Sequence, residues 1–393
     1  MLKLHNTLLR ELEEFKPINS DVIQLFVCGP TVYDFDHIGH AKTYTQFDIV
    51  ARTLRYLGYN VKYVQNITDI DDKIIMRAKE KDVEPSVLAL EYMKYHIDDM
   101  EKLGNTSVDK YAPATDYILQ IVSQVKRLLE KGFAYKTSDG YYFDIKKFDD
   151  YGKLSGRRAL GPNDAVSRID ENPEKRNPGD FCLWKFKKEG EPSWSTDGLE
   201  EGRPGWHIED TAITETEFGS QYDIHGGAID LIFPHHEAEI AQMESISGMK
   251  PFVRYWLHTG FLNINSEKMS KSLKNFITIR EVFERIVSPL SLRYLFLLSH
   301  YRTTANFTWE ALEAAENAYM KLKDFMSKMP FDTGEIDQAY KAKFVEKLEN
   351  DFNTPQALAV LWTLVKDKEV TPENKKATLL DFDKVLGLGF STV

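Results

Sequence analysis

FVCGPTVYDFDHIGHAKTY, residues 26–44, is the stretch that decides the fold, because it leads from the end of a strand into the start of a helix. A strand is expected over residues 22–28, and the Gly-Pro pair after it marks a tight turn. Gly58 stands where the following helix would end. Between the two, apolar side chains recur at helical spacing, at Phe47, Val50, Ala51 and Leu54. The stretch therefore predicts a strand, a turn and a helix over residues 41–57.

Two short motifs, far apart in the chain, have the residue types of phosphate-binding segments. The histidine motif, His37-Ile38-Gly39-His40, opens the predicted helix, and the lysine motif, Lys268-Met269-Ser270-Lys271-Ser272, lies in a predicted loop. Each motif alone also suits an ordinary capped helix or a solvated basic turn. Their occurrence together, in this order, favours an enzyme that activates its substrate with a nucleotide.

The reaction that suits these residues is attack of a carboxylate on the α-phosphate of ATP. The imidazoles of His37 and His40, beside the free N–H groups of a helix start, suit the negative charge that develops on phosphate oxygens. Gly39 has no side chain where a purine or ribose would approach the backbone. Lys268 and Lys271 would neutralise the departing pyrophosphate. These four histidines and lysines are the catalytic candidates, and Gly39 and Lys271 are candidates for binding ATP.

The order of strands and helices predicts an α/β fold with a doubly wound parallel sheet of Rossmann type. Strands at 22–28 and 61–65 alternate with helices, including a largely helical region at 73–104. A hairpin at 134–144 and a Pro- and Gly-rich stretch then indicate an insertion. The chain becomes helical from about residue 288. The expected units are 1–110, 111–200, 201–287, 288–310 and 311–393.

Composition and charge restrict the class of protein. With 42% hydrophobic and 28% charged residues and no long apolar run, the chain matches a soluble globular protein without a membrane span. Two cysteines cannot form a disulfide framework and no signal peptide is visible, so a cytoplasmic location is expected. The net charge of −11 argues against nonspecific binding to nucleic acid, but it leaves room for a tRNA held by local basic patches.

A third motif, PHHEAE at residues 234–239, has the residue types of a metal site. His235 and Glu239 are one helical turn apart and can bind one ion, whereas His236 is expected to point elsewhere. Cys28, at the end of the strand 22–28, is a candidate third ligand. The same spacing also suits a polar helix start stabilised by i,i+4 pairs, and the residues alone leave both interpretations open.

Residues 223–230, DIHGGAID, end a predicted strand with a pair of glycines. Glycine is expected where a backbone must approach a ligand closely, which makes Gly227 a candidate for ATP binding. Asp230 is a candidate for holding a ribose hydroxyl. An ordinary tight turn would explain the same pair of glycines.

The chain resembles the cysteinyl-tRNA synthetases, which are class I aminoacyl-tRNA synthetases. The resemblance implies a Rossmann-type catalytic domain split by a connective insertion, then a stem-contact segment and an α-helical C-terminal bundle. It also implies that L-cysteine and ATP, with Mg²⁺, form cysteinyl-adenylate, and that the cysteinyl group passes to the 3′ end of tRNA(Cys). The segments that carry it follow in family order: 26–44, 66–74 (NITDIDDKI), 175–185 (KRNPGDFCLWK), 202–209 (GRPGWHIE), 223–242, 268–276 and 351–361 (DFNTPQALAVL).

In that family a zinc ion binds the substrate thiolate directly, and its preference for sulfur rejects serine without an editing site. Position by position, the resemblance implies Cys28, His235 and Glu239 as zinc ligands. The fourth position departs from the family pattern, because Asp210 stands where a cysteine usually follows Trp-His-Ile-Glu. Aspartate can bind zinc and keeps the charge, but it is a harder ligand than a thiolate.

The resemblance extends to the substrate pocket and to the length of the chain. Thr68 and Trp206 match family positions that help to form the cysteine pocket, and Gly29 is a further substrate-binding candidate. Family members usually continue into a small domain that reads the anticodon, so the resemblance implies a compact form that lacks it. Discrimination would then rest on the acceptor end of the tRNA. A monomer is expected.

Two other functions compete with this one. A cysteine ligase of the mycothiol-ligase type would couple cysteinyl-adenylate to an amino sugar, and such ligases also lack an anticodon domain. A non-catalytic paralogue would serve as a binding module, although the two intact motifs argue against it. Cysteine-dependent ATP–pyrophosphate exchange, followed by charging of tRNA, separates the three functions.

Overall fold

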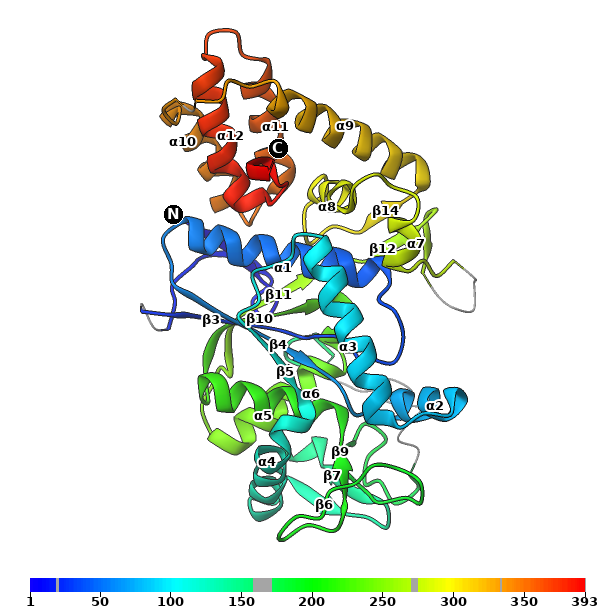
Figure 1. Ribbon diagram of the computed structural model, residues 1–393. Coiled ribbons are helices and arrows are strands. Elements are labelled where there is room, and N and C mark those ends of the chain that lie inside the picture. The colour runs from blue at the N-terminus through cyan, green and yellow to red at the C-terminus, as the bar shows by residue number, and fades with distance from the viewer. Residues whose placement is uncertain (19–20, 158–171, 270–274, 333, 393) are drawn as a thin grey trace.

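The computed structural model describes residues 1–18, 21–157, 172–269, 275–332 and 334–392, and a five-stranded parallel sheet forms its centre (Figure 1). The strands follow the order β11-β10-β3-β4-β5, and every neighbouring pair is parallel. After β3, the chain adds β4 and β5 on one side of that strand, and it later adds β10 and β11 on the other side. The bounds are β3 Ile23–Val27, β4 Val61–Ile67, β5 Lys110–Pro113, β10 Tyr222–Ala228 and β11 Val253–Thr259.

Helices cover both faces of this sheet (Figure 1), which confirms the predicted doubly wound α/β class. On one face, Phe47 and Val50 of α1 share a core with Leu25 of β3. On the opposite face, Ile208 of α5 shares a core with Phe26 of β3 and with residues of α4 and α6. The helices are α1 Ile38–Tyr56, α2 Asp72–Lys81, α3 Pro85–Lys102, α4 Ile118–Glu130, α5 Trp206–Phe218 and α6 His235–Ser247.

The expected elements differ from the structure mainly at their ends. α1 begins at Ile38 rather than at residue 41, because His37 caps it. The region 73–104 contains two helices: α2 ends before Asp82, whose backbone is left-handed at φ 54°, and α3 begins at Pro85. Proline suits a first helical turn, where its missing N–H would have no helical partner.

The chain between β5 and β10 contains an antiparallel sheet of four strands in chain order. The strands are β6 Ala134–Lys136, β7 Gly140–Phe143, β8 Phe181–Phe186 and β9 Gly202–Pro204. β6 and β7 form the hairpin expected at 134–144. Asp72 of α2 holds this sheet in place, because its carboxylate accepts from Lys185 Nζ at 2.7 Å and from Arg203 Nη2 at 2.5 Å.

A small sheet, in the order β13-β12-β14, leads into the C-terminal helical bundle (Figure 1). α11 begins at Thr354, because Asn353 caps it and accepts from the backbone N–H of Gln356 at 3.2 Å. Within the described ranges, no helix is long and apolar enough to cross a membrane. The remaining elements are β1 Lys3–Asn6, β2 Glu11–Glu14, β12 Leu262–Ile264, β13 Glu267–Lys268, β14 Ala305–Phe307, α7 Ile279–Phe283, α8 Pro289–Leu297, α9 Trp309–Ser327, α10 Gln338–Glu349, α11 Thr354–Lys366 and α12 Pro372–Leu386.

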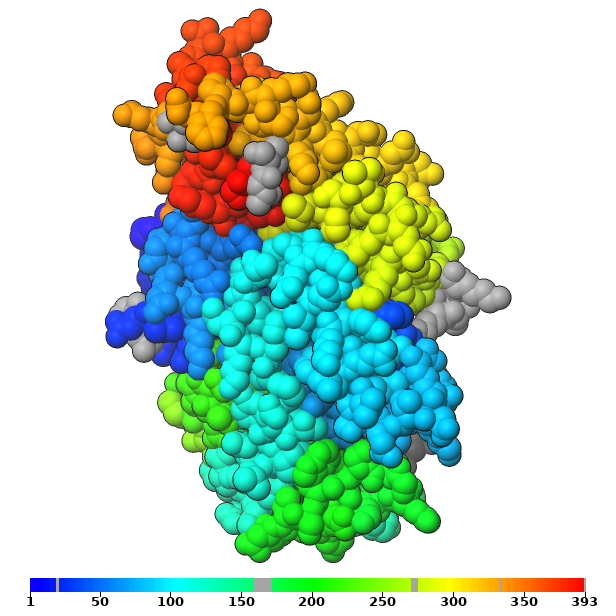
Figure 2. Space-filling model, in the orientation of Figure 1, coloured from blue at the N-terminus to red at the C-terminus, as the bar shows by residue number. Residues whose placement is uncertain are grey.

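A buried arginine joins the bundle to α1. Arg293 of α8 is completely buried, and its Nη2 lies 2.6 Å from Asp48 Oδ2 on α1. Its Nε donates to the carbonyl of Leu386, at the end of α12, at 2.6 Å. Burial alone would raise the pKa of Asp48, but Arg293 and Arg52 hold that pKa below its usual value. The bundle therefore rests directly on the N-terminal part of the molecule (Figure 2).

Replacing Arg293 with methionine is expected to destabilise the fold by about 3–5 kcal/mol, because it leaves Asp48 charged and buried without its main partner. The measurement is urea unfolding followed by tryptophan fluorescence. Lys102→Met is the matched control, because it breaks an exposed ion pair with Asp98, worth at most about 1 kcal/mol. Equal losses in the two variants would contradict the role given to Arg293.

Candidate active site

The carboxyl ends of β3, β10 and β11 open into a cavity of about 450 Å³. Ligands of open α/β sheets bind at this edge, where the chain switches from one side of the sheet to the other. Thr68, Gly227 and Glu239 are not part of the lining, and Lys271 lies outside the described residues. The predicted site residues that line the cavity are Cys28, Gly29, His37, Gly39, His40, Trp206, Asp210, Asp230, His235 and Lys268.

The histidine motif forms the first turn of α1 at the cavity wall. His37 is the N-cap, and its Nδ1 accepts from the backbone N–H of His40 at 3.2 Å. The rings of His37 and His40 stack with their centroids 3.8 Å apart. A Cβ on Gly39 would lie 2.9 Å from the His37 ring and 3.2 Å from Met269, so glycine allows this close packing. The turn therefore presents two imidazoles at the positive end of a helix, which suits an anion.

The lysine motif lies against the histidine motif in the described part of the chain. Lys268 ends β13, and its Nζ lies 5.1 Å from the centroid of the Phe261 ring, which also lines the cavity. After the motif the chain pairs with the start of α1: Ile38 N–H donates to Ile277 at 3.1 Å, and Ile279 N–H donates to Asp36 at 2.9 Å. The two motifs, more than 200 residues apart in sequence, thus meet at one cavity.

Cys28, Asp210, His235 and Glu239 come together at the cavity floor. Asp210 Oδ2 lies 3.2 Å from Cys28 Sγ and 3.1 Å from His235 Nε2. His235 Nε2 lies 3.1 Å from Glu239 Oε1, which is 3.9 Å from Cys28 Sγ. A tetrahedral zinc ion needs its donor atoms roughly 3.3–3.8 Å apart, as its usual bond lengths require. The separations of 3.1–3.9 Å lie within about 0.2 Å of that range, so the four donors are close enough together to hold one such ion.

Acidic groups are concentrated at this floor. Burial, and then the charges of Asp210 and Glu239, raise the pKa of the Cys28 thiol well above its usual value. Burial, and then Asp210, raise the pKa of Glu239 in the same way. Among the described residues, the ion pairs of Asp210 and Glu239 are made with histidines and none with lysine or arginine. A bound cation would supply the positive charge that these groups lack.

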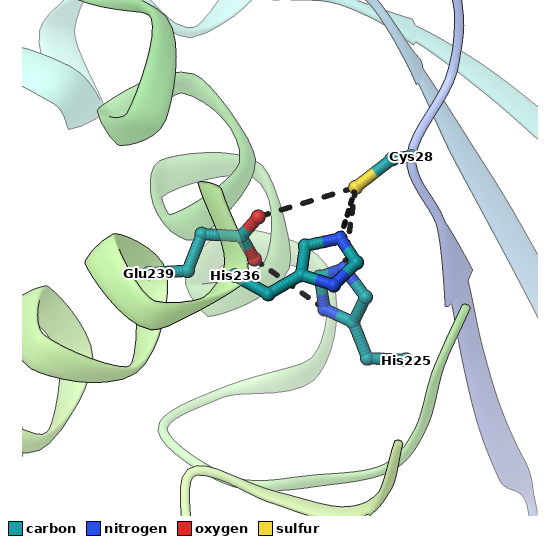
Figure 3. A group of neighbouring side chains, drawn as sticks. All are labelled: Cys28, His225, His236 and Glu239. Atoms are coloured by element: carbon teal, nitrogen blue, oxygen red, sulfur yellow. Dashed lines mark hydrogen bonds and ion pairs between the residues drawn. The ribbon is translucent and has the colours of Figure 1, made fainter. Parts of the chain in front are cut away.

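A second group of possible metal donors shares Cys28 and Glu239 (Figure 3). Cys28 Sγ lies 3.3 Å from His225 Nε2 and 3.2 Å from His236 Nε2. The expectation that His236 points elsewhere is therefore wrong. The physical reason is that α6 is buried on all sides, so a helical face turned away from Glu239 still lies inside the protein. His225 was not singled out from the sequence, since only the pairing of β10 places it here.

The two groups differ in their access to the cavity. Asp210 and His235 line the cavity together with Cys28, whereas His225 and His236 are completely buried and do not. The outer nitrogens of the buried pair are already bonded: His225 Nδ1 lies 2.6 Å from the Tyr222 hydroxyl, and His236 Nδ1 lies 2.8 Å from His258 Nε2. Burial, and then neighbouring histidines, lower the pKa of both far below the usual value. The Asp210 group is thus the one that a ligand in the cavity can reach.

The other predicted residues divide between the cavity and its surroundings. Trp206 is 40% exposed, and its ring stacks on His235 at 4.2 Å, so it forms a wall beside the metal group. A Cβ on Gly29 would lie 1.7 Å from the Asn66 carbonyl oxygen, so only glycine fits there. Thr68 is buried and donates to Glu209 at 2.9 Å.

Gly227 and Glu209 both lie behind the cavity lining, and Glu209 was not among the residues predicted from the sequence. A Cβ on Gly227 would lie 2.9 Å from the His236 ring, so this glycine serves contact with that ring. Glu209 is completely buried, and its Oε1 has no hydrogen-bond partner among the described residues. Burial, and then Asp210, raise the pKa of Glu209 well above its usual value.

Comparison with known proteins gives consistent matches over nearly the whole chain. The family model described as tRNA synthetases class I (C) catalytic domain matches residues 14–317, and the DALR domain model matches residues 343–391. The cysteine–tRNA ligase of Thermoplasma acidophilum is 52% identical over 357 residues, which are 90% of this chain and 78% of that protein. That of Thermoplasma volcanium is 50% identical over 399 residues, 98% of this chain and 87% of that protein.

More distant proteins share the fold. The cysteine–tRNA ligase of Pyrococcus furiosus is 44% identical and covers 95% of this chain and 82% of its own length. A solved structure of Mycobacterium tuberculosis methionyl-tRNA synthetase in complex with methionyl-adenylate has a TM-score of 0.64 and covers 94% of this chain and 90% of that chain. At 17% identity, that structure supports the fold alone.

Proposed function

The chain belongs to the class I cysteine–tRNA ligase family, and from that membership we propose how its own residues carry out the reaction. It activates L-cysteine with ATP and transfers the cysteinyl group to the 3′ end of tRNA(Cys). The observation that supports this assignment in the structure is a cavity with the histidine motif at its wall and a group of four possible metal donors at its floor.

In the activation step, the carboxylate of cysteine attacks the α-phosphate of ATP, and pyrophosphate leaves. His37, His40 and the positive end of α1 meet the charge on the phosphate oxygens. Lys268 and Lys271 balance the charge of the departing pyrophosphate. We assign Gly29 and Trp206 to the cysteine side of the cavity, and Gly39 and Asp230 to the ATP side, whereas Thr68 and Gly227, which do not line the cavity, would act from behind it.

Lys271→Ala and His40→Asn are expected to slow adenylate formation by about 10²–10³-fold, with a smaller effect on ATP affinity, because both groups act on charge that develops during the reaction. Single-turnover measurement of adenylate formation tests this. Lys328→Ala is the control, since that lysine is exposed on the bundle, where it pairs with Asp324. An unchanged rate constant in Lys271→Ala would remove the role assigned to it.

We propose that zinc is held by Cys28, Asp210, His235 and Glu239. The donor spacing and the excess of buried acidic groups support this set. When bound, zinc supplies a Lewis acid that prefers the thiolate of cysteine to the hydroxyl of serine. The ring of Trp206 stacks on the ring of His235 and would hold that imidazole in place at the cavity floor.

Asp210→Cys is expected to keep or raise the zinc content and to preserve selection of cysteine over serine, whereas Asp210→Ala lowers the zinc content. Metal analysis of protein purified without chelator, and the absorption of cobalt-substituted protein, measure occupancy independently of activity. His236→Asn is the comparison, since it belongs only to the closed histidine group. If His236→Asn loses zinc while Asp210→Ala retains it, the ion is bound by the group of Cys28, His225, His236 and Glu239 instead. Absence of zinc from an active, chelator-insensitive enzyme would exclude both sites.

We propose that the acceptor end of the tRNA enters the same cavity and carries most of the discrimination, because its 3′-terminal ribose has to reach the adenylate there. Residues 111–200 would act as the connective insertion and residues 288–310 as the stem-contact segment. A minihelix of the acceptor stem is then expected to be charged nearly as fast as whole tRNA(Cys). If kcat/KM for the minihelix is about 100-fold or more below that for whole tRNA(Cys), recognition depends on contacts outside the cavity.

A further inference from the structure

A buried carboxylate lies between two histidines immediately before α1. Asp36 is 6% exposed, and its Oδ1 lies 2.6 Å from His40 Nδ1. Its Oδ2 lies 2.5 Å from Nδ1 of His96, which is on α3 and also buried. The backbone carbonyl of Asp36 accepts from Ile279, just beyond the lysine motif. Asp36 thus contacts His40, α3 and the segment that carries the lysine motif.

The ionisation of Asp36 determines which nitrogens carry hydrogen. Burial alone would raise its pKa, but His96 and His40 together hold that pKa well below its usual value, so the carboxylate is ionised. An ionised carboxylate only accepts hydrogen bonds. The Nδ1 atoms of His40 and His96 must therefore both carry hydrogen.

His37 has the opposite arrangement. Its Nδ1 accepts the backbone N–H of His40 as the N-cap of α1, so that nitrogen cannot carry hydrogen while the cap is formed. His37 is therefore neutral, with its hydrogen on Nε2. The two stacked rings of the histidine motif are thus unequal, because His40 Nδ1 faces the carboxylate of Asp36 whereas His37 Nδ1 caps the helix.

His96 holds the Asp36 carboxylate on the side away from His40. Its Nε2 is buried and has no hydrogen-bond partner among the described residues, so Asp36 is the group to which this ring is bonded. The edges of Tyr44 and Tyr111 surround the same ring, with centroids 5.3 Å and 5.9 Å from it. With both oxygens bonded, Asp36 cannot rotate away from His40.

We propose that Asp36, supported by His96, is a positioning residue that makes His40 the protonated member of the histidine motif when ATP is bound. His40 would then offer a charged Nε2–H to a phosphate oxygen, while His37 offers a neutral one. This inference rests on the proposed role of His40 in adenylate formation. It assigns different tasks to two histidines that the sequence presents as equivalent.

The first test is the protonation state itself. In protein labelled with ¹⁵N-histidine and bound to α,β-methylene-ATP, both ring nitrogens of His40 are expected to show the chemical shifts of N–H groups. In Asp36→Asn, Nε2 of His40 is expected to lose its hydrogen. A His40 that is neutral in the unaltered protein, or equally protonated in Asp36→Asn, would overturn the proposal.

The second test is kinetic. Asp36→Asn is expected to slow adenylate formation by about 10–100-fold, the usual loss when a group that orients a functional histidine is removed, with the KM for cysteine nearly unchanged. In the double variant Asp36→Asn/His40→Asn, the rate should equal that of His40→Asn, because Asp36 acts through His40. A further loss in the double variant would contradict this. If His40→Asn alone has no effect, the proposed role of His40 fails, independently of Asp36.

Variants of His96 and α3 separate positioning from folding. His96→Gln can still donate an amide N–H to Asp36 and should recover most of the rate that His96→Leu loses. Asp98→Asn removes the same charge from an exposed position of α3, where it pairs with Lys102 and Arg280, and should leave the rate unchanged. If Asp36→Asn does not fold, the comparison of the two His96 variants tests the proposal instead. Equal rates of adenylate formation in His96→Gln and His96→Leu would overturn it.

Discussion

The buried pair of Asp48 and Arg293 fixes the direction of α1, and most of the active site depends on that direction. The helix has its first turn at the cavity and its later turns under the bundle, so one rigid element belongs to both. A charge pair inside a core contributes little net stability, but it penalises any arrangement that separates the partners. The register between α1 and α8 is therefore well defined, and with it the position of His37 and His40.

The cavity has two chemically different ends. Cys28, Asp210 and His235 supply soft and anionic donors at the floor, while the histidine motif and Lys268 supply hydrogen-bond donors and positive charge at the wall. Under the proposed function, a cysteine molecule fits this polarity in one orientation, with sulfur toward the floor and carboxylate toward the phosphates. Selectivity and reactivity then come from the same alignment, because a side chain that cannot bind the floor does not hold its carboxylate in place.

Features that depend on residues close together in the sequence could be predicted from it. The strand and the helix follow from local periodicity and turn chemistry, and the i,i+4 relation of His235 and Glu239 is geometric. The cap by His37, which moves the start of the helix from residue 41 to Ile38, was not predicted. His225, His236 and His258 could not be predicted in this way. His258 lies opposite Gly227 only through the pairing of β10 with β11, and helical spacing says nothing of His236 when α6 has no exposed face. The contact of Asp36 with His96 likewise requires α3 to fold back over 60 residues of chain.

The strand order also has a consequence for synthesis on the ribosome. β3 is in the middle of the sheet, yet one of its neighbours, β4, follows soon after it, while the other, β10, follows only after residues 28–221. At ~5–20 residues per second, that interval lasts roughly 10–40 s. During it, the growing chain exposes an apolar strand edge that can pair with other chains. The central position of β3, which ends one residue before Cys28, thus makes the nascent polypeptide dependent on protection until its second half emerges.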